Sequence, residues 1–169
     1  MVKWREVELP GFDAPLVPVA AGRREAFAAH VHELLADLKT PARAARKAGP
    51  APPAEVREVA TGCALCRGFC CRTGGNEAYL NPRTLARVWS ERAHLTADDL
   101  VATYLDAVPD LAFEDSCIFH AEHGCNLPRA MRSTVCHDYQ CTPLRNALSA
   151  LPEASEGATP GRPAPGCQT

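Results

Sequence analysis

The sequence predicts a mainly α fold, a small helical domain interrupted by irregular cysteine-rich loops. Three observations lead to this prediction. Apolar side chains recur at helical spacing in three segments, helix-start signals precede two of those segments, and two groups of cysteines have loop-like spacings with glycines nearby. No internal repeats interrupt this order. The order of elements is therefore arm, helix, cysteine group, two helices and a second cysteine group.

The composition limits what kind of protein this is. The chain has 169 residues, enough for one domain, and 46% of them are hydrophobic, so it should fold. Its formal charge of -2 and pI near 6.3 give no overall attraction to nucleic acid or to anionic membranes. Only 6% of the residues are aromatic, against 15 prolines, so large side chains that could fill a core are few.

We expect three regions along the chain. Residues 1–22 carry prolines and short apolar pairs and should form an extended arm. Residues 23–149 should form the helical cysteine-rich domain. Residues 150–169, rich in Pro and Gly, should be a disordered tail, and the Pro/Ala-rich residues 40–53 should be a solvated linker.

The first helix should run from Arg23 to Lys39. Its apolar residues follow one another at steps of four, three, one and three and form one stripe: Phe27, Val31, Leu34, Leu35 and Leu38. Because steps of three and four return to the same side of a helix, this stripe should pack against the rest of the domain.

Two more helices are expected between the cysteine groups. Asn81-Pro82 supplies an N-cap and a first-turn proline for one helix, and Thr96 with Asp99 forms a capping box for the next. Their inner faces are Leu85, Val88 and Trp89 in the first, and Leu100, Val101, Tyr104, Leu105 and Val108 in the second, which should end at Pro109. Just before them, Glu77–Leu80 suggests a short strand.

The first cysteine group is the most informative feature. It consists of four cysteines within nine residues, Cys63, Cys66, Cys70 and Cys71. Two cysteines separated by two residues make a tight turn whose sulfurs converge on one ion, and Gly62 and Gly68 permit such a turn. In an extended chain neighbouring side chains point to opposite faces, so Cys70 and Cys71 should not both face one ion.

A second group completes a set of eight thiols. It consists of Cys117, Cys125, Cys136 and Cys141, at spacings of eight, eleven and five residues that match no standard finger. Thiolates of this number hold zinc, iron or an iron–sulfur cluster. The count allows two sites of four sulfurs each, interleaved between the groups, or one cluster with spare thiols. In either case we expect the protein to bind metal ions.

Residues near the two groups have less certain roles in the sequence alone. His120, His123 and His137 could each replace a sulfur, although a plain surface position is the simpler interpretation. Four arginines adjoin the cysteines and could offset thiolate charge or simply solvate loops: Arg67, Arg72, Arg129 and Arg132. Cys167 lies in the expected tail and should take no part.

The cellular location follows from what the sequence does not contain. The first residues have no apolar run of the kind that makes a signal peptide, and no segment reaches ~18 continuous apolar residues. We therefore expect a cytoplasmic protein without a membrane partner. In that compartment thiols stay reduced, so metal ligation is favoured over a disulfide framework.

The cysteine spacing from about Thr61 to Cys141 resembles the YkgJ-like CxxCxxCC family of zinc- or iron-chelating domains. The first cysteine group matches the family's first motif, and Gly124-Cys125 and the Arg132–Cys136 spacing match its later steps. Two departures are visible: three residues separate Cys66 from Cys70 where the family has two, and Ser133 stands where a proline commonly follows the arginine. The resemblance implies metal chelation by the eight cysteines.

The leading functional prediction is a cytosolic zinc- or iron-chelating cysteine-cluster protein whose physiological role is open. The alternative is an iron–sulfur-dependent protein methyltransferase, because some relatives with this pattern resemble flagellin lysine N-methylases. The chain shows neither a glycine-rich strand–turn–helix for a methyl donor nor a nucleophile–base arrangement, so whether it is an enzyme is undecided. We do not expect nucleic-acid binding, since no basic face with interleaved aromatics is present.

Overall fold

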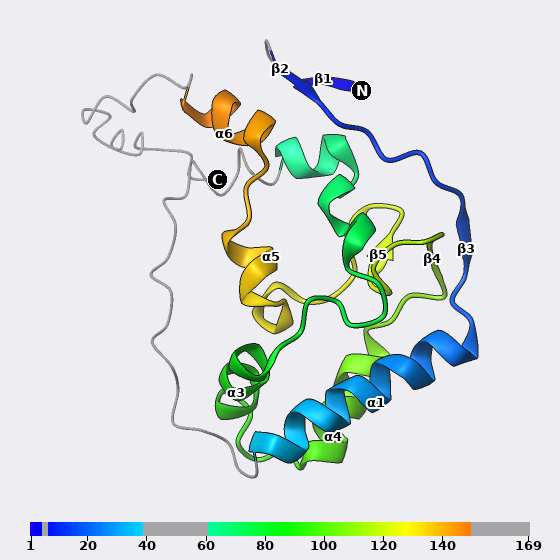
Figure 1. The fold of residues 1–169 in the computed structure, drawn as a ribbon, viewed down its shortest axis with the longest axis vertical. Helices are drawn as coiled ribbons and strands as arrows, with labels where there is room; N and C mark the ends of the chain where they lie inside the picture. The colour runs from blue at the N-terminus through cyan, green and yellow to red at the C-terminus, as the bar shows by residue number, and fades with distance from the viewer. Residues whose placement is uncertain (5–6, 39–60, 150–169) are drawn as a thin grey trace, which may run out of the picture.

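The computed structural model describes residues 1–4, 7–38 and 61–149 (Figure 1). The predicted linker at 40–53, the predicted tail at 150–169 and Cys167 lie outside the described residues. Within them the fold is mainly α, as predicted. The first expected helix is α1 (Ala21–Leu38), which begins two residues before Arg23.

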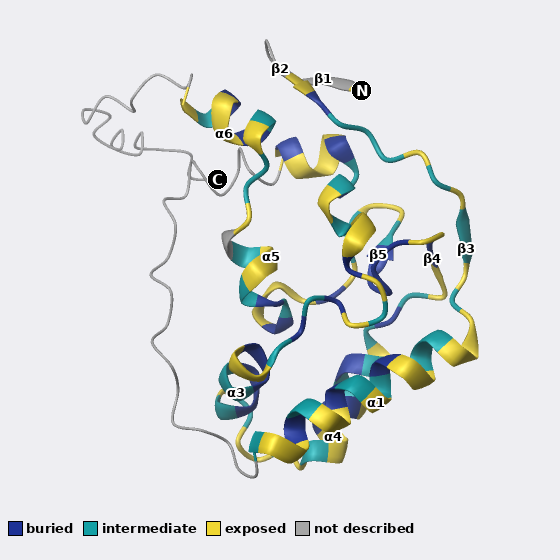
Figure 2. Cartoon of the chain, in the orientation of Figure 1, coloured by how far each residue is buried: buried dark blue, intermediate teal, exposed yellow. Residues whose placement is uncertain are grey.

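Three helices form the body of the domain. α1 packs against both α3 (Pro82–Ser90) and α4 (Ala97–Asp106). Figure 2 shows buried residues on the side of α1 that faces α4 and exposed residues on its outer side. The predicted stripe is confirmed, because Phe27, Val31 and Leu35 are buried.

Both predicted helix starts are confirmed. The Asn81 side chain accepts a hydrogen bond from the amide of Thr84 at 2.9 Å, and Pro82 occupies the first turn of α3. Thr96 and Asp99 form a reciprocal capping box at the start of α4. Each cap satisfies amides that have no partner inside the helix and contributes ~1 kcal/mol.

The core extends from these helices into the second cysteine region. Phe27 packs edge-to-face on Phe119, with ring centroids 5.2 Å apart. The buried hydroxyl of Tyr104 donates to the main-chain oxygen of Met131 at 2.9 Å. The helix body therefore shares one hydrophobic cluster with the segment around Cys117–Phe119, while Cys66 and Cys141 belong to a smaller second cluster with Leu9 and Leu144.

Short antiparallel strands connect the N-terminal region to distant segments. β1 (Val2–Trp4) pairs with β2 (Val7–Leu9), and β3 (Leu16–Pro18) pairs with β4 (Leu111–Phe113). Leu9 is 1% exposed and lies against α6 (Thr142–Ser149), the last helix described. The arm is extended and runs along the domain from α6 to the start of α1 (Figure 1).

The predicted strand at Glu77–Leu80 is wrong, because these residues form turns. Ala78 and Tyr79 both have positive φ, 51° and 56°, which a strand cannot contain. The Tyr79 hydroxyl is hydrogen-bonded to the hydroxyl of Thr73 and donates to the main-chain oxygen of Cys70 at 3.2 Å. These contacts fold the chain back onto the first cysteine segment.

Candidate metal centre

The first cysteine group lies on two short helical segments rather than on a plain loop. Residues 61–66 are helical and carry Cys63 and Cys66, and the 3-10 helix η1 (Phe69–Thr73) carries Cys70 and Cys71. Between them the chain turns at Gly68, with φ of 71°. A Cβ at Gly68 would lie 2.7 Å from Nε2 of His120, so this turn requires glycine for both conformation and space.

The second group is carried by a hairpin and a short helix. β5 (His120–Ala121) and β6 (Gly124–Cys125) form the hairpin, and Gly124 has a φ of 106° at its turn. α5 (Thr134–Asp138) carries Cys136, and Cys141 directly precedes α6. Cys117 precedes the hairpin and is buried.

Main-chain hydrogen bonds join the two groups directly. The amide of Cys117 donates to the oxygen of Cys71 at 3.0 Å, and the amide of Ile118 donates to the oxygen of Gly75 at 2.9 Å. A Cβ at Gly74 would lie 2.8 Å from the Cβ of Cys117. The absence of a side chain at Gly74 therefore lets Cys117 approach the end of η1.

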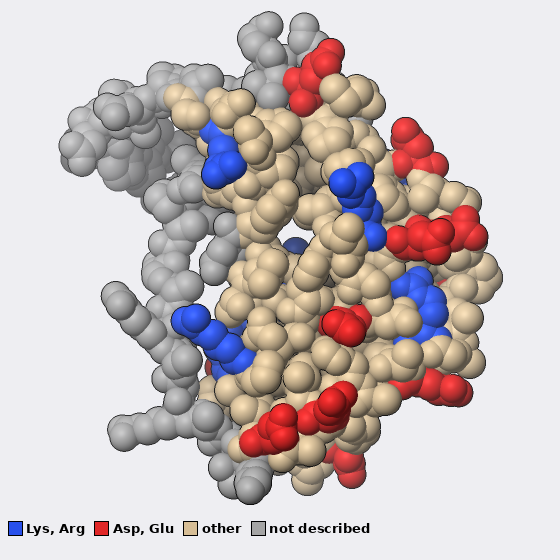
Figure 3. Space-filling view, viewed as in Figure 1, with Lys and Arg blue, Asp and Glu red and all other residues tan. Residues whose placement is uncertain are grey.

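All eight predicted ligand residues line one cavity of about 600 Å³. They are Cys63, Cys66, Cys70, Cys71, Cys117, Cys125, Cys136 and Cys141. All eight are free thiols. A hollow is visible near the middle of the face in Figure 3, between α5 and the first cysteine segment, and acidic and basic side chains are interspersed around it.

Burial dominates the protonation of most of these thiols. It raises the pKa of Cys63 and of Cys136 to about 11 and that of Cys117 to about 12, and it also raises the pKa of Cys66 and Cys125. Neighbouring cysteines raise these pKa values further, since a second thiolate nearby is unfavourable. Without a cation, these five thiols are therefore neutral at pH 7.

Cys70 differs from the other cysteines. Interaction with the neighbouring Cys71 thiol lowers the pKa of Cys70 to about 7. The same interaction, more than burial, raises the pKa of Cys71. The expectation that these two side chains diverge was based on an extended chain, whereas both residues lie in the 3-10 helix η1. There Cys70 is exposed and Cys71 is half-buried.

The sulfurs share the cavity without closing around one point. Within residues 1–4, 7–38 and 61–149, no group of three or more Cys, His, Asp or Glu side chains has the spacing that a single ion requires. The donor set nevertheless suits zinc or iron, since thiolates are the preferred protein ligands of both in closed sites. Ligation would require the cysteine side chains to turn inward from positions that already face the cavity.

Arg132 places a permanent positive charge at this cavity. Its guanidinium donates to the main-chain oxygens of Leu127 at 2.8 Å and of Cys125 at 3.0 Å. Its charge acts to lower the thiol pKa values of Cys63, Cys125 and Cys136. The predicted role of an arginine beside the ligands thus has an electrostatic basis at Arg132, although its hydrogen bonds go to carbonyls rather than to sulfur.

Two of the other arginines contact aromatic rings. The guanidinium of Arg67 lies 4.9 Å from the ring centroid of Phe113, and that of Arg72 lies 4.2 Å from that of Phe69. Both contacts are cation–π interactions. That of Arg67 joins the first cysteine segment to β4, whereas that of Arg72 lies within η1.

The three histidines have different positions. The expected surface position is wrong for His120, which is fully buried between the rings of Phe12 and Phe113. Its Nε2 donates to the main-chain oxygen of Arg67 at 2.6 Å, and its Nδ1 accepts from the hydroxyl of Ser116 at 2.6 Å. The Nε2 bond therefore fastens the two cysteine segments together, and the Nδ1 bond to Ser116 orients the ring within the second segment.

His123 and His137 line the cavity. His123 is exposed. Nε2 of His137 donates to the main-chain oxygen of Arg129 at 2.7 Å. Ligation stays a prediction for both, and in His137 it would have to use Nδ1 because Nε2 is engaged with Arg129.

Several residues that support the cavity were not identified from the sequence. The buried Ser133 caps α5 and donates its hydroxyl to the main-chain oxygen of Tyr79 at 2.7 Å. Arg87 on α3 donates to the main-chain oxygens of Ala130 and Arg132 at 2.7 and 2.9 Å. Only the three-dimensional arrangement reveals these contacts, because each joins residues more than 40 positions apart in the sequence.

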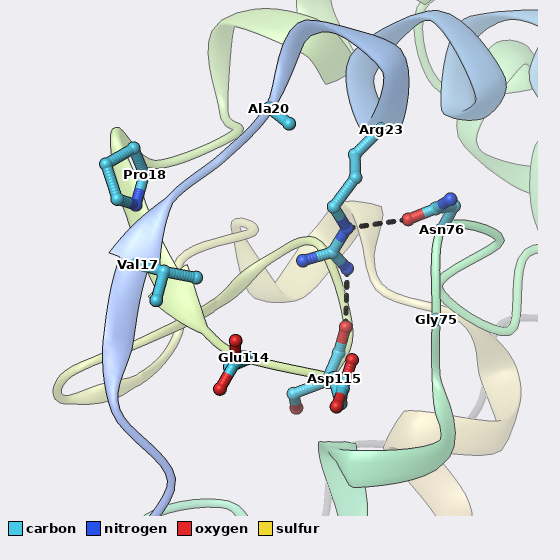
Figure 4. A pocket seen from close by; sticks show the side chains of 9 residues that line it. Val17, Pro18, Ala20, Arg23, Gly75, Asn76, Glu114 and Asp115 are labelled. Atoms are coloured by element: carbon cyan, nitrogen blue, oxygen red, sulfur yellow. Dashed lines mark hydrogen bonds between the residues drawn. The ribbon is translucent and has the colours of Figure 1, made fainter.

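A second cavity, of about 480 Å³, lies beside α1 (Figure 4). Arg23 reaches across it and donates to the side chain of Asn76 at 2.8 Å and to the main-chain oxygen of Ser116. Figure 4 shows Glu114 and Asp115 on the opposite wall. Asn76 follows the first cysteine group and Ser116 precedes Cys117, so Arg23 ties α1 to both cysteine segments.

Comparisons of this chain with protein family models, with curated proteins and with solved structures found no match. Membership of the YkgJ-like family therefore stays a prediction from the cysteine spacing. None of the helices in the described part of the chain has the length and apolar character needed to cross a membrane.

Proposed function

We propose that this chain is a cytoplasmic metal-binding protein whose eight cysteines hold zinc or iron, the latter as ions or as an iron–sulfur centre. The observation that carries the proposal is the gathering of eight free thiols, from segments more than 40 residues apart, on a single cavity. Eight cysteines placed for packing alone would be distributed through the core, as small apolar residues are. The resemblance of their spacing to the YkgJ-like chelating domains supports the same function.

The electrostatics of the cavity support a cationic ligand. Burial raises the pKa of Cys63, Cys117 and Cys136 well above neutrality, so these thiols are neutral when nothing is bound. A divalent cation reverses this preference, because a coordinated thiol is deprotonated outright. Four thiolates around one divalent ion carry a net charge of about -2. Arg132 is placed to offset part of that charge.

Metal binding would also serve folding. The chain has few aromatic residues, and its two cysteine segments are otherwise joined by main-chain hydrogen bonds and by polar side chains such as His120 and Ser133. Structural zinc contributes roughly 10–16 kcal/mol of apparent binding free energy in small domains. A metal held between the segments would therefore add to these contacts and stabilise the fold.

Purification without air, followed by absorption spectroscopy and elemental analysis, tests this function. An iron–sulfur protein absorbs visible light near ~400 nm, whereas a zinc protein is colourless. We expect about one to two metal ions per chain, or one cluster, and a lower content in the Cys63→Ser variant.

Cys167→Ser is the control, because Cys167 lies outside the cysteine groups and should not change the metal content. A chain that folds normally, contains no zinc or iron and gains neither on reconstitution contradicts the proposal.

A further inference from the structure

The eight thiols at the cavity belong to two separate hydrophobic environments. The larger hydrophobic cluster, which includes Phe27 and Tyr104, contains Cys117, and Cys71 and Cys125 pack against it. The smaller cluster, which includes Leu9 and Leu144, contains Cys66, and Cys141 packs against it. The cavity therefore has two walls, and each wall presents cysteines from both sequence groups.

Local structure places five of these cysteines on one wall or the other. Cys71 and Cys117 are joined by a main-chain hydrogen bond of 3.0 Å, and Gly74 leaves room for their close approach. On the other wall, Cys63 and Cys66 lie on one helical turn, where the thiol of Cys66 donates to the main-chain oxygen of Cys63 at 3.4 Å. Cys141 reaches that wall because α6 packs on β2 through Leu144 and Leu9.

We propose that the cysteines form two distinct four-sulfur metal sites, each built from both sequence groups. The inner site consists of Cys71, Cys117, Cys125 and Cys136. The outer site consists of Cys63, Cys66, Cys70 and Cys141. This inference rests on the proposed function and goes beyond it, because metal binding alone is equally compatible with one cluster and spare thiols.

The electrostatic neighbours of the thiols support the same division. Cys70 and Cys141 raise the pKa of both Cys63 and Cys66. Cys125 and Cys136 raise the pKa of Cys117. Cys70 lies at the boundary, because it also acts on the pKa of Cys71, Cys125 and Cys136. The two sites therefore adjoin at the neighbouring residues Cys70 and Cys71.

The two sites differ in how firmly their ligands are held. The inner wall is continuous with the helix body, where Tyr104 and Arg87 donate to main-chain oxygens of residues 130–132, just before α5. The outer wall rests on the smaller cluster, and two of its four cysteines, Cys63 and Cys70, are exposed, against one of the inner four, Cys136. A chelator should therefore reach the outer site first, and the inner site should keep its metal longer.

Stepwise removal of zinc with mapping of the freed thiols tests this division. The full chain is reduced without air, loaded with Zn²⁺ and treated with increasing chelator. Newly exposed thiols are alkylated at each step and assigned by mass spectrometry of peptides. We expect about two Zn²⁺ per chain at the start, with Cys63, Cys66, Cys70 and Cys141 labelled together before the other four.

The chain offers a matched pair of variants for the same measurement, since Cys66 and Cys117 are each 7% exposed. Cys66→Ser should lose one zinc and leave the inner four thiols protected. Cys117→Ser should lose the other zinc and leave the outer four protected. If Cys117→Ser fails to fold, Cys136→Ser replaces it, because Cys136 is exposed and its loss disturbs packing less.

The possible outcomes separate the two proposals. Zinc that is released in one step with all eight thiols, or labelling that mixes the two sets, overturns the division while leaving metal binding intact. A chain that binds no Zn²⁺ overturns the proposed function and the division with it.

Discussion

The hydroxyl of Ser133 donates to the main-chain oxygen of Tyr79 at 2.7 Å, joining residues 54 positions apart in the sequence. Tyr79 belongs to the turn that folds back on the first cysteine group, and Ser133 caps the helix that carries Cys136. This single bond therefore helps to set the distance between the two cysteine groups.

Ser133→Ala should destabilise the protein by about 1–3 kcal/mol, since it leaves the Tyr79 carbonyl without this partner and removes a helix cap. Chemical denaturation of the reduced protein measures the loss. The matched control is Ser149→Ala, whose exposed hydroxyl donates within α6 and whose removal should change stability by less than about 0.5 kcal/mol. Equal losses in the two variants would show that the Tyr79 contact is unimportant.

Gly74→Ala should displace Cys117. The added Cβ would lie 2.8 Å from the Cβ and 3.1 Å from the Sγ of Cys117, and both are too close. Overpacking of this kind costs about 1–3 kcal/mol, and the metal content should fall with it. Gly22→Ala is the control, since nothing lies within 4 Å of its added Cβ. Normal metal content in Gly74→Ala would contradict the assigned place of Cys117.

Arg132→Leu should move metal binding to higher pH. Arg132 lowers the thiol pKa values of Cys63, Cys125 and Cys136, so its removal makes these thiols harder to deprotonate. Because metal and protons compete for the same sulfurs, the pH of half-maximal loading should rise by about half a unit or more. Metal content measured across a pH series, with the exposed Arg83→Leu as control, checks this shift. If the pH of half-maximal loading stays unchanged, the charge of Arg132 does not act on the ligand thiols.

His120 should make stability depend on pH. Burial lowers the pKa of His120 below its usual value of 6.5, and the positive charge of Arg67 acts in the same direction. The folded state therefore binds fewer protons at this position than the unfolded chain. The contribution of His120 is fully present above about pH 6.5, and it is lost as the pH falls toward its lower pKa in the folded protein.

The His120 contribution can be isolated by a double comparison. The melting temperature is measured at about pH 7.5 and about pH 5.5 for the protein and for His120→Gln, which cannot titrate in this range. The melting temperature should fall less on acidification in the variant than in the unchanged protein. Competition between protons and metal for the thiols affects both proteins equally. A larger or equal drop in the variant would refute the assigned role.

The sequence predicted those features that depend on neighbouring residues. The caps at Asn81 and Thr96 and the stripe of α1 are local patterns, and the structure confirms them. The turn at Ala78 and Tyr79 was predicted as a strand, because its apolar residues resemble one and the contacts that fold it come from Thr73 and Cys70. Strand propensity alone could not reveal that contacts with other segments would impose a turn here.

In the candidate site too, some features depend on residue type and others on the fold. All eight cysteines were identified from their spacing, since thiol chemistry is evident in the residue type itself. Their distribution over two walls could not be predicted, because it depends on the packing of α6 against Leu9 and of Cys117 against Gly74. The burial of His120 escaped prediction for a similar reason, since both of its partners and both of its covering rings are set by the fold.

The most direct test of metal binding by these cysteines is the mass of the intact, anaerobically prepared chain under non-denaturing conditions. We predict a mass above that of the bare polypeptide by one or two metal ions or one iron–sulfur cluster, with the excess lost in acid and reduced in Cys117→Ser. A folded chain with the mass of the bare polypeptide, before and after incubation with zinc or iron, would contradict the account.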